Sequence, residues 1–311
     1  MAATERTIVA LVGATATGKT ALGEALAARL GGEVVCADAR QVFRELEVGT
    51  GKPTRAERQA RPHHLFDWLT LDDRPTAGAW ARAASAVCEA CFARGVTPLL
   101  VGGSGLYVAA LQKGLHPEPP RDEVLRARLE REWEAEGAER MLARLASLDA
   151  ATAAALRVRD RQRVLRALEV VTAGGHPLAW WRTDARHAPV AATWRTFEVT
   201  CATPELNRRI TARCRAMWSR GLLDETRAIE AAGKGPQLRR LAAIGYDEAL
   251  DFLDGTLDQD AALARMDART RQLAKRQRTW FRHQQAAERV DGTGGVWTEE
   301  TLELILRSIR M

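Results

Sequence analysis

The sequence predicts an α/β protein in which helices flank a parallel sheet and an all-helical segment is inserted. Thr7 to Val12 is a short apolar run typical of a buried strand, and residues 21–30 continue in strong helix formers. The turn between them fits the pattern G-x-x-x-x-G-K-[ST], as Gly13-Ala14-Thr15-Ala16-Thr17-Gly18-Lys19-Thr20. Strand, glycine-rich turn and helix in this order predict a sheet of the type found in P-loop nucleoside triphosphatases.

A phosphate is expected to bind at residues 13–20. Backbone N–H groups of such a loop point at an anion, Lys19 adds a positive charge, and the Thr20 hydroxyl is suited to bind Mg2+. The pattern leaves open whether the phosphate belongs to a nucleotide.

Three further strands are predicted, at residues 33–37, 97–101 and 196–200. The first ends at Asp38, which should stand near the phosphate loop as a Mg2+ ligand, a general base or a helix cap. The second runs into Gly102-Gly103-Ser104, where a ligand approaches the backbone or the chain makes a tight turn. Because this strand ends in glycine instead of an acidic residue, hydrolysis of ATP is disfavoured.

Residues 121–189 are predicted to form a helical insertion, and residues 1–120 with 190–311 the α/β core. Five arginines and one aspartate occupy residues 157–166, and this favours contact with a nucleic-acid backbone over a solvated face balanced by the acidic residues 130–139. A basic stripe at Arg271, Lys275, Arg278 and Arg282 is a second candidate surface. Trp180 and Trp181 either pack in the core or stack on bases.

Composition indicates a globular protein with a polyanionic partner. The chain has 311 residues, 46% hydrophobic and 28% charged, with a net charge of +6. It shows no run of membrane-spanning length and no signal peptide, so we expect a cytoplasmic protein. Five scattered cysteines, with Cys88 and Cys91 at helical spacing, predict buried thiols. The His63-His64 pair could suggest a zinc site, but adjacent side chains on an extended chain point to opposite faces, which disfavours one.

Two segments near the predicted site leave alternatives open. Residues 49–62 are rich in glycine, proline and charge, and predict a loop or lid. Arg209 and Arg213 lie one helical turn apart, where they either clamp a diphosphate or form a surface pair.

Taken in order, the motifs resemble the tRNA dimethylallyltransferase family, which prenylates N6 of adenosine 37 beside the anticodon. The resemblance spans nearly the whole chain, and its most specific stretches are residues 102–107 and 271–277. The matching stretches are the phosphate loop, residues 38–41, 49–53, 62–65, 99–107, 162–169, 244–246 and 271–277.

The resemblance implies that the loop holds dimethylallyl diphosphate, not ATP, together with Mg2+ at Thr20, and that the target is a tRNA reading codons that begin with U. Asp38 would accept the proton from N6, Arg213 would neutralise the leaving diphosphate, and Ser104 would keep a hydroxyl near the reacting centre. A monomer is expected, and its insertion would grip the anticodon stem-loop. The tRNA-binding positions implied are Asp38, Ala39, Arg40, Gln41, Ser104, Arg126, Gln162, Arg163, Val164, Leu165, Arg166, Ile244, Gly245, Tyr246, Arg271, Lys275 and Arg278.

The sequence departs from the family pattern at Ala14, Ala39, Phe43, Ala242 and Asp247. These changes bear on tRNA affinity and on which nucleotide is accepted. The main alternative is an isopentenyltransferase acting on a free adenine nucleotide, which the insertion and both arginine clusters disfavour. A small-molecule P-loop kinase and a non-catalytic tRNA-binding protein are the other two.

Overall fold

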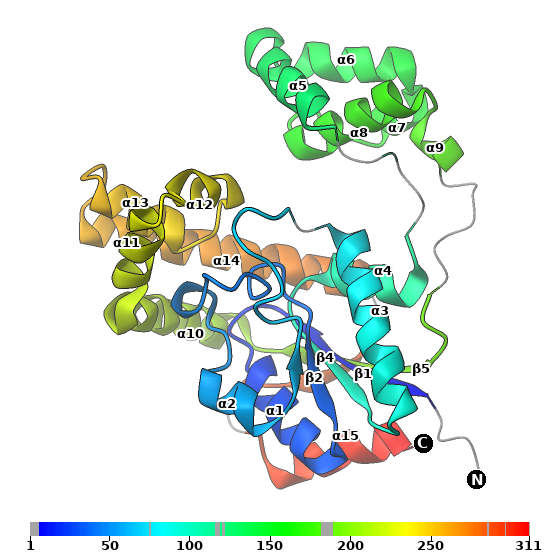
Figure 1. Ribbon diagram of the computed structural model, residues 1–311, viewed down its shortest axis with the longest axis vertical. Coiled ribbons are helices and arrows are strands. Elements are labelled where there is room, and N and C mark those ends of the chain that lie inside the picture. The colour runs from blue at the N-terminus through cyan, green and yellow to red at the C-terminus, as the bar shows by residue number, and fades with distance from the viewer. Residues whose placement is uncertain are drawn as a thin grey trace. The chain divides into compact units, whose positions relative to one another are not determined.

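The computed structural model describes residues 6–74, 76–115, 119, 122–181, 189–284, 286–295 and 297–310. The chain divides into two compact units (Figure 1). We call Met1–Gln112 with Val190–Met311 the α/β unit, and Lys113–Pro189 the helical unit. The boundary predicted between residues 120 and 121 lies outside the described residues.

A six-stranded parallel sheet forms the centre of the α/β unit. Its strands lie in the spatial order β3 (His63–His64), β2 (Glu33–Cys36), β4 (Pro98–Val101), β1 (Thr7–Gly13), β5 (Thr193–Thr200) and β6 (Glu288–Asp291). The four predicted strands are confirmed. The two edge strands were not predicted, because β3 has only two residues and three of the four residues of β6 are exposed. The carboxyl ends of parallel strands share one edge of the sheet, which is where a site is expected.

Helices cover both faces of the sheet, which explains why β1 is apolar throughout (Figure 1). Val9 and Leu11 pack in one cluster with residues of α1 (Lys19–Leu30) and α15 (Glu299–Arg310). Ile8, Ala10 and Val12 point to the other face and pack with α3 (Ala77–Ala93) and α4 (Gly105–Lys113). The strand's two-residue alternation therefore joins both hydrophobic layers.

The remaining helices of the α/β unit lie in the chain before β3 or between β5 and β6. They are α2 (Arg55–Ala60), α10 (Thr203–Met217), α11 (Leu223–Ala231), α12 (Gly235–Leu241), α13 (Tyr246–Leu253) and α14 (Gln259–Gln284), with the short turns η1 (Val48–Thr50) and η2 (Trp218–Leu222).

The prediction of a loop at residues 49–62 is wrong over α2. Thr54 accepts a hydrogen bond from Glu57 N–H, and the Glu57 carboxylate accepts one from Thr54 N–H, so a capping box starts the helix. The T-x-x-E spacing was readable in the sequence, but the neighbouring Gly and Pro residues obscured it.

The helical unit contains α5 (Glu123–Glu136), α6 (Ala138–Leu148), α7 (Ala150–Ala154), α8 (Arg161–Gly174) and α9 (Leu178–Trp181), and no strand among its described residues. Leu129, Met141, Leu145, Leu165 and Leu168 form its fully buried centre. The unit thus has a hydrophobic core of its own. Within the part of the chain that the structure describes, no helix has the length and apolarity needed to cross a bilayer.

Candidate active site

The phosphate loop lines a cavity of about 270 Å3 at the carboxyl edge of the sheet. Gly18 has a φ of 96°, a left-handed conformation that favours glycine, and α1 begins at the next residue. The Ala14 carbonyl accepts hydrogen bonds from Lys19 Nζ and Thr17 Oγ1. Of the eight loop residues, the cavity is lined by Thr15, Ala16, Gly18, Lys19 and Thr20, whereas Gly13, Ala14 and Thr17 shape the turn from behind.

Two cations face this cavity, the buried Lys19 and the half-buried Arg213. Burial lowers the pKa of the Lys19 ammonium to about 7; Asp38 opposes this shift, and the positive charge of Arg213 adds to it. Burial also lowers the pKa of the Arg213 guanidinium, again opposed by Asp38. Arg213 Nη2 donates a hydrogen bond to the Thr50 carbonyl at 3.0 Å, which aims the guanidinium into the cavity. Glu24 also lines the cavity, but it contacts Arg61 and His63, so Lys19 and Arg213 are available to bind an anion.

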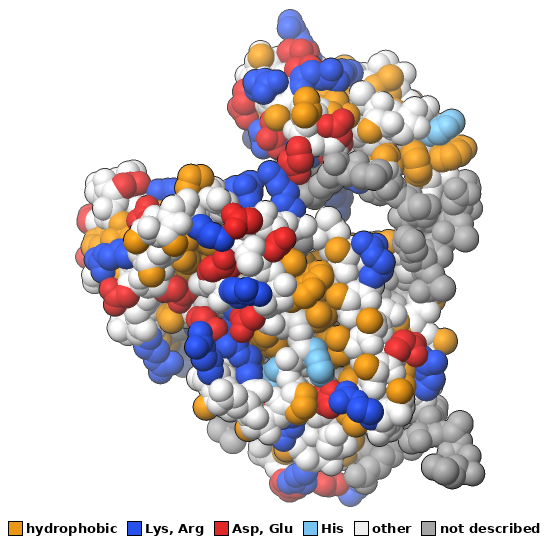
Figure 2. Space-filling model, in the orientation of Figure 1, with side chains coloured by type: hydrophobic (Ala, Val, Ile, Leu, Met, Phe, Trp, Pro, Cys, Tyr) orange, Lys and Arg blue, Asp and Glu red, His pale blue; other side chains and the backbone are white. Residues whose placement is uncertain are grey.

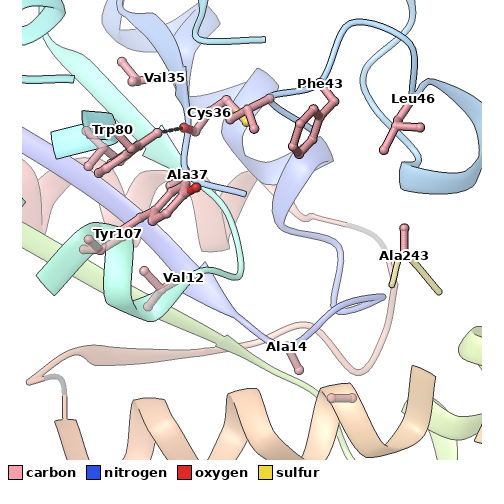
Figure 3. Close-up of a cluster of buried hydrophobic side chains, with 14 of the residues drawn as sticks. Val12, Ala14, Val35, Cys36, Ala37, Phe43, Leu46, Trp80, Tyr107 and Ala243 are labelled. Atoms are coloured by element: carbon pink, nitrogen blue, oxygen red, sulfur yellow. Dashed lines mark hydrogen bonds between the residues drawn. The ribbon is translucent and has the colours of Figure 1, made fainter. Parts of the chain in front are cut away.

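Asp38 lies two residues after the end of β2, and the segment before it is held by aromatic side chains. Trp80 Nε1 donates to the Cys36 carbonyl at 2.9 Å, and the Trp80 ring stacks on Tyr107 with centroids 4.8 Å apart (Figure 3). Asp38 Oδ1 accepts hydrogen bonds from the N–H groups of Arg40 at 2.8 Å and Gln41 at 3.3 Å. No helix directly follows Asp38, so the helix-cap alternative is wrong: Oδ1 closes a turn over residues 38–41, while Oδ2 makes no hydrogen bond to any described residue.

The glycines after β4 let three segments meet. A Cβ on Gly102 would lie 2.0 Å from the Ala37 carbonyl oxygen, so only glycine fits there. Ser104 Oγ accepts a hydrogen bond from Ala39 N–H at 2.9 Å. The hydroxyl thereby fixes the residue that follows Asp38, and this bond remains available although Ala39 has replaced the serine of the family pattern.

A second cavity, of about 380 Å3, adjoins the phosphate cavity. Its walls include Ala39, Arg40, Ser104, Ile244 and Tyr246, all predicted to contact tRNA, whereas Gln41 lines the phosphate cavity instead. The two cavities share the wall residues Thr15, Asp38, Thr50, Gly103, Arg213 and Gln277.

The Ile244-Gly245-Tyr246 motif also supports a loop of the phosphate cavity. Tyr246 is fully buried; its hydroxyl donates to Glu225 Oε1 at 2.5 Å and accepts from Gly49 N–H at 3.1 Å. The Glu225 carboxylate also accepts the N–H groups of residues 47 and 48, each at 2.7 Å. This network shapes η1, which presents the Thr50 carbonyl to Arg213.

The basic stripe predicted on α14 lies on a different face from the cavities. Arg271 pairs with Asp267 at 2.7 Å, Arg278 donates to Thr203 Oγ1, and Lys275 is exposed; none of the three lines either cavity. The charge pattern did not predict that another face of α14 lines the second cavity, although the helical spacing of those residues can be read from the sequence. Its cavity-lining members are Arg269, Gln272, Leu273, Arg276 and Gln277.

Of the two arginines considered as a diphosphate clamp or a surface pair, Arg213 lines the phosphate cavity and Arg209 does not. Arg209 pairs with Glu205 at 2.8 Å and donates to the Thr293 carbonyl at 2.6 Å. It thus holds the turn before Trp297, whose Nε1 donates to the Gly18 carbonyl at 3.2 Å. Trp297 was not predicted as part of the site, because no local pattern links it to the phosphate loop.

Two predicted tRNA contacts in the helical unit are wrong for the side chains concerned. Val164 and Leu165 are fully buried in the core of this unit, where the apolar face of α8 packs on α5 and α6. Gln162 and Arg163 are exposed, and the Arg163 side chain keeps 66% of its surface accessible. RNA can reach α8 only on that polar face.

The arginine cluster has more counter-charge than its own segment supplies. Arg161 pairs with Glu134 of α5 at 3.0 Å, and Arg166 pairs with the buried Glu169 at 3.0 Å. Arg126 contacts Glu130 at 2.8 Å and Glu169 at 3.8 Å. Figure 2 accordingly shows basic and acidic side chains interspersed on the visible face of this unit. Acidic residues from α5 and α8 therefore neutralise part of the arginine charge, and the sequence of residues 157–166 alone does not show this.

The histidine pair and the cysteines have structural partners. His63 Nε2 contacts Glu24 at 2.5 Å and His64 Nε2 contacts Glu33 at 2.7 Å, so the rings point to different groups as expected. Glu33, His64 and Cys91 have ligand atoms within 4.8 Å of one another, but Arg94 already pairs with Glu33 at 2.7 Å. All five cysteines are free and buried.

Two departures from the family pattern have clear local roles. Asp247 pairs with Arg269 at 2.8 Å at the wall of the second cavity, and burial raises the pKa of its carboxyl. Ala242 ends α12 with a φ of 49°, a left-handed conformation rare for alanine.

The oxygen groups around the phosphate cavity fit a magnesium ion. The Thr20 hydroxyl and the Asp38 carboxylate line the same cavity, and Mg2+ prefers such ligands together with phosphate oxygens. The Thr20 hydroxyl makes no hydrogen bond to another described residue, so it is available to a ligand.

A P-loop sheet whose phosphate cavity adjoins a second cavity, with Asp38 lining both, is an arrangement suited to a transferase. The family model described as IPP transferase matches residues 41–284, and that described as isopentenyl transferase matches residues 6–75. The chain belongs to the IPP transferase family.

Relatives of known name agree with this assignment. The chain is 46% identical to a tRNA dimethylallyltransferase of Anaeromyxobacter sp. (strain K), covering 88% of this chain and 90% of the relative. It is 39% identical to the enzyme of that name from Geobacter sulfurreducens, over 91% of each chain. The crystal structure of the full-length tRNA isopentenylpyrophosphate transferase of Bacillus halodurans is 31% identical, with a TM-score of 0.68 over 98% of this chain and 96% of that one.

Proposed function

We propose that this protein transfers a dimethylallyl group from dimethylallyl diphosphate to N6 of adenosine 37 in tRNAs that read codons beginning with U. The observation that carries the proposal is the shared wall of the two cavities, which includes both Asp38 and Arg213. The reaction takes place in the cytoplasm, where the tRNA substrate resides, and the protein acts as a monomer.

The diphosphate would occupy the phosphate cavity, and the target adenine the second cavity. The adenine would have to leave its base stack to enter this cavity, because a stacked base cannot reach it. The N6 lone pair forms a bond to C1 of the dimethylallyl group while the C1–O bond breaks and diphosphate leaves. Asp38 Oδ2 takes the proton that N6 loses, because Oδ1 is engaged by the backbone of residues 40 and 41.

Lys19 and Arg213 would stabilise the negative charge that grows on the leaving diphosphate. Thr20, with the diphosphate oxygens, would hold Mg2+, which supplies further charge neutralisation when bound. The apolar part of the second cavity, which includes Met217, Met266 and Leu273, excludes water and so protects the allylic carbon from hydrolysis.

The exposed polar face of α8 would contact the anticodon stem-loop. The one ion pair of the Arg163 side chain with a described residue is a 3.6 Å contact to Asp160, so its charge is available to a phosphate. An enzyme for a free nucleotide has no use for such a surface.

Single-turnover transfer of labelled dimethylallyl diphosphate tests the proposal. The acceptors are an anticodon stem-loop carrying A36-A37-A38, the same RNA with G at position 37, AMP and ATP. We expect label only in the first RNA. Label in AMP or ATP alone would identify an enzyme for free nucleotides, and label in none would refute prenyl transfer.

Asp38→Asn tests the role of the carboxylate in the same assay. Asparagine keeps the oxygen that accepts the N–H groups of residues 40 and 41, so the loop should persist. We expect a loss of about 10²- to 10⁴-fold in rate, as for removal of a general base, with RNA affinity unchanged. A variant as fast as the parent would leave Asp38 without a catalytic role.

A further inference from the structure

Gln277, on α14, connects two loops that are far from it in sequence. Its Oε1 accepts a hydrogen bond from the Thr15 N–H of the phosphate loop at 2.9 Å. Its Nε2 donates to the Gly103 carbonyl at 3.0 Å. One half-buried side chain therefore holds the phosphate loop and the glycine loop after β4 at a fixed separation.

An amide has the chemistry for this pair of bonds, and an ionised carboxylate does not. The side chain must accept from an N–H group on one side and donate to a C=O group on the other, which a carboxylate cannot do. Space is also restricted, since a Cβ on Gly103 would lie 2.2 Å from Gln277 Nε2. The second glycine of the Gly102-Gly103 pair is thus explained by the approach of this amide.

The bonds continue from Gln277 to the catalytic carboxylate. Gly103 is followed by Ser104, whose Oγ accepts the Ala39 N–H at 2.9 Å, and Ala39 follows Asp38. Gln277 is also one of the residues that line both cavities. Its amide lies where the donor and the acceptor of the transferred group have to meet.

We propose that Gln277 is a positioning residue that sets the distance between the phosphate loop and Asp38, and so aligns the diphosphate donor with the attacking amine. The kinetic part of this inference rests on the proposed function. A change of this separation by about 1 Å is enough to lower a rate about 100-fold while leaving the binding of each substrate nearly intact.

Three variants test the assignment. Gln277→Met keeps the length of the side chain and removes both bonds. Gln277→Glu cannot donate as a carboxylate, but once protonated it carries an O–H donor and a C=O acceptor like the amide. Gln259→Glu makes the same change at the exposed first residue of α14, away from both loops, and is the matched control.

We measure single-turnover transfer at saturating substrates between about pH 5 and pH 8, so that the lower limit approaches the ordinary pKa of a glutamate and its protonated fraction rises as the pH falls. Each variant is expressed as a ratio to the parent, because the charged groups that line the two cavities are the same in every protein. They are Lys19, Glu24, Asp38, Arg40, Arg213, Arg269 and Arg276. Gln277→Met should be about 100-fold slow at every pH, with substrate dissociation constants within about threefold of the parent. The Gln277→Glu ratio should rise at least about tenfold as the pH falls, and the Gln259→Glu ratio should stay near one.

Hydrogen exchange of the Thr15 amide gives a readout that needs no activity. We expect faster exchange in Gln277→Met than in the parent, because the amide loses its acceptor. A parent that transfers no prenyl group would refute the proposed function, and the Thr15 exchange would still decide the role of Gln277. Unchanged Thr15 exchange, a Gln277→Met rate within about twofold of the parent, or a flat Gln277→Glu ratio would each overturn the inference.

Discussion

Tyr246→Phe removes one hydroxyl from the network beneath the phosphate cavity. That hydroxyl donates to the Glu225 carboxylate and accepts the Gly49 N–H, at a side chain that is fully buried. The phenyl ring still fills the same space against Gly49, where a Cβ would lie 2.5 Å from it. The change therefore tests the polar bonds without opening a cavity.

The expected cost follows from the two bonds. A hydrogen bond to a charged group contributes about 1.5–3 kcal/mol, and a buried N–H left without a partner costs about 1–3 kcal/mol. Because one hydroxyl serves both, we expect the α/β unit to lose about 2–4 kcal/mol of unfolding free energy. Loosening of η1 also releases the Thr50 carbonyl from Arg213, so pyrophosphate affinity should fall about tenfold, which corresponds to about 1.4 kcal/mol.

Urea unfolding, amide exchange at residues 47–50 and pyrophosphate calorimetry measure these effects. Tyr107→Phe is the matched control, since Tyr107 is the other tyrosine of the chain and stacks on Trp80 without a hydroxyl hydrogen bond to a described residue. Equal stability and equal exchange in Tyr246→Phe and Tyr107→Phe would refute the reasoning.

Three further outcomes are expected. Because burial lowers the Lys19 pKa to about 7, the free enzyme must take up a proton to bind diphosphate above that pH. The pyrophosphate dissociation constant should therefore rise about tenfold per pH unit above about pH 8 in the parent but not in Lys19→Arg. Parallel pH profiles of the two proteins would contradict this. Arg163→Ala should weaken stem-loop binding and reduce the slope of log affinity against log salt by about one. Arg126 is paired with Glu130 within the helical unit, so Arg126→Ala should change this slope less. Equal slopes in Arg163→Ala and the parent would remove α8 from the RNA interface. Leu165→Ala should destabilise the helical unit by about 2–5 kcal/mol in urea unfolding, and unchanged stability would contradict its core position.

The sequence alone determined the features that depend on neighbouring residues. The phosphate loop, the four principal strands and the helical character of residues 122–181 follow from local spacing and apolar periodicity. Asp38 was located because the end of a parallel strand is a topological position, and a strand can be recognised from a few consecutive residues.

Tertiary structure decided which side chains meet. Gln277 contacts Thr15 across 262 residues of sequence, and Tyr246 reaches Gly49 across 197. The same helix spacing placed Arg209 and Arg213 on neighbouring turns, yet only one faces the cavity, because Glu205 and the Thr293 carbonyl hold the other. A local pattern fixes which residues share a face of a helix, but what that face meets is set by packing of distant segments, and this determined both the wall of the second cavity and the role of Gln277.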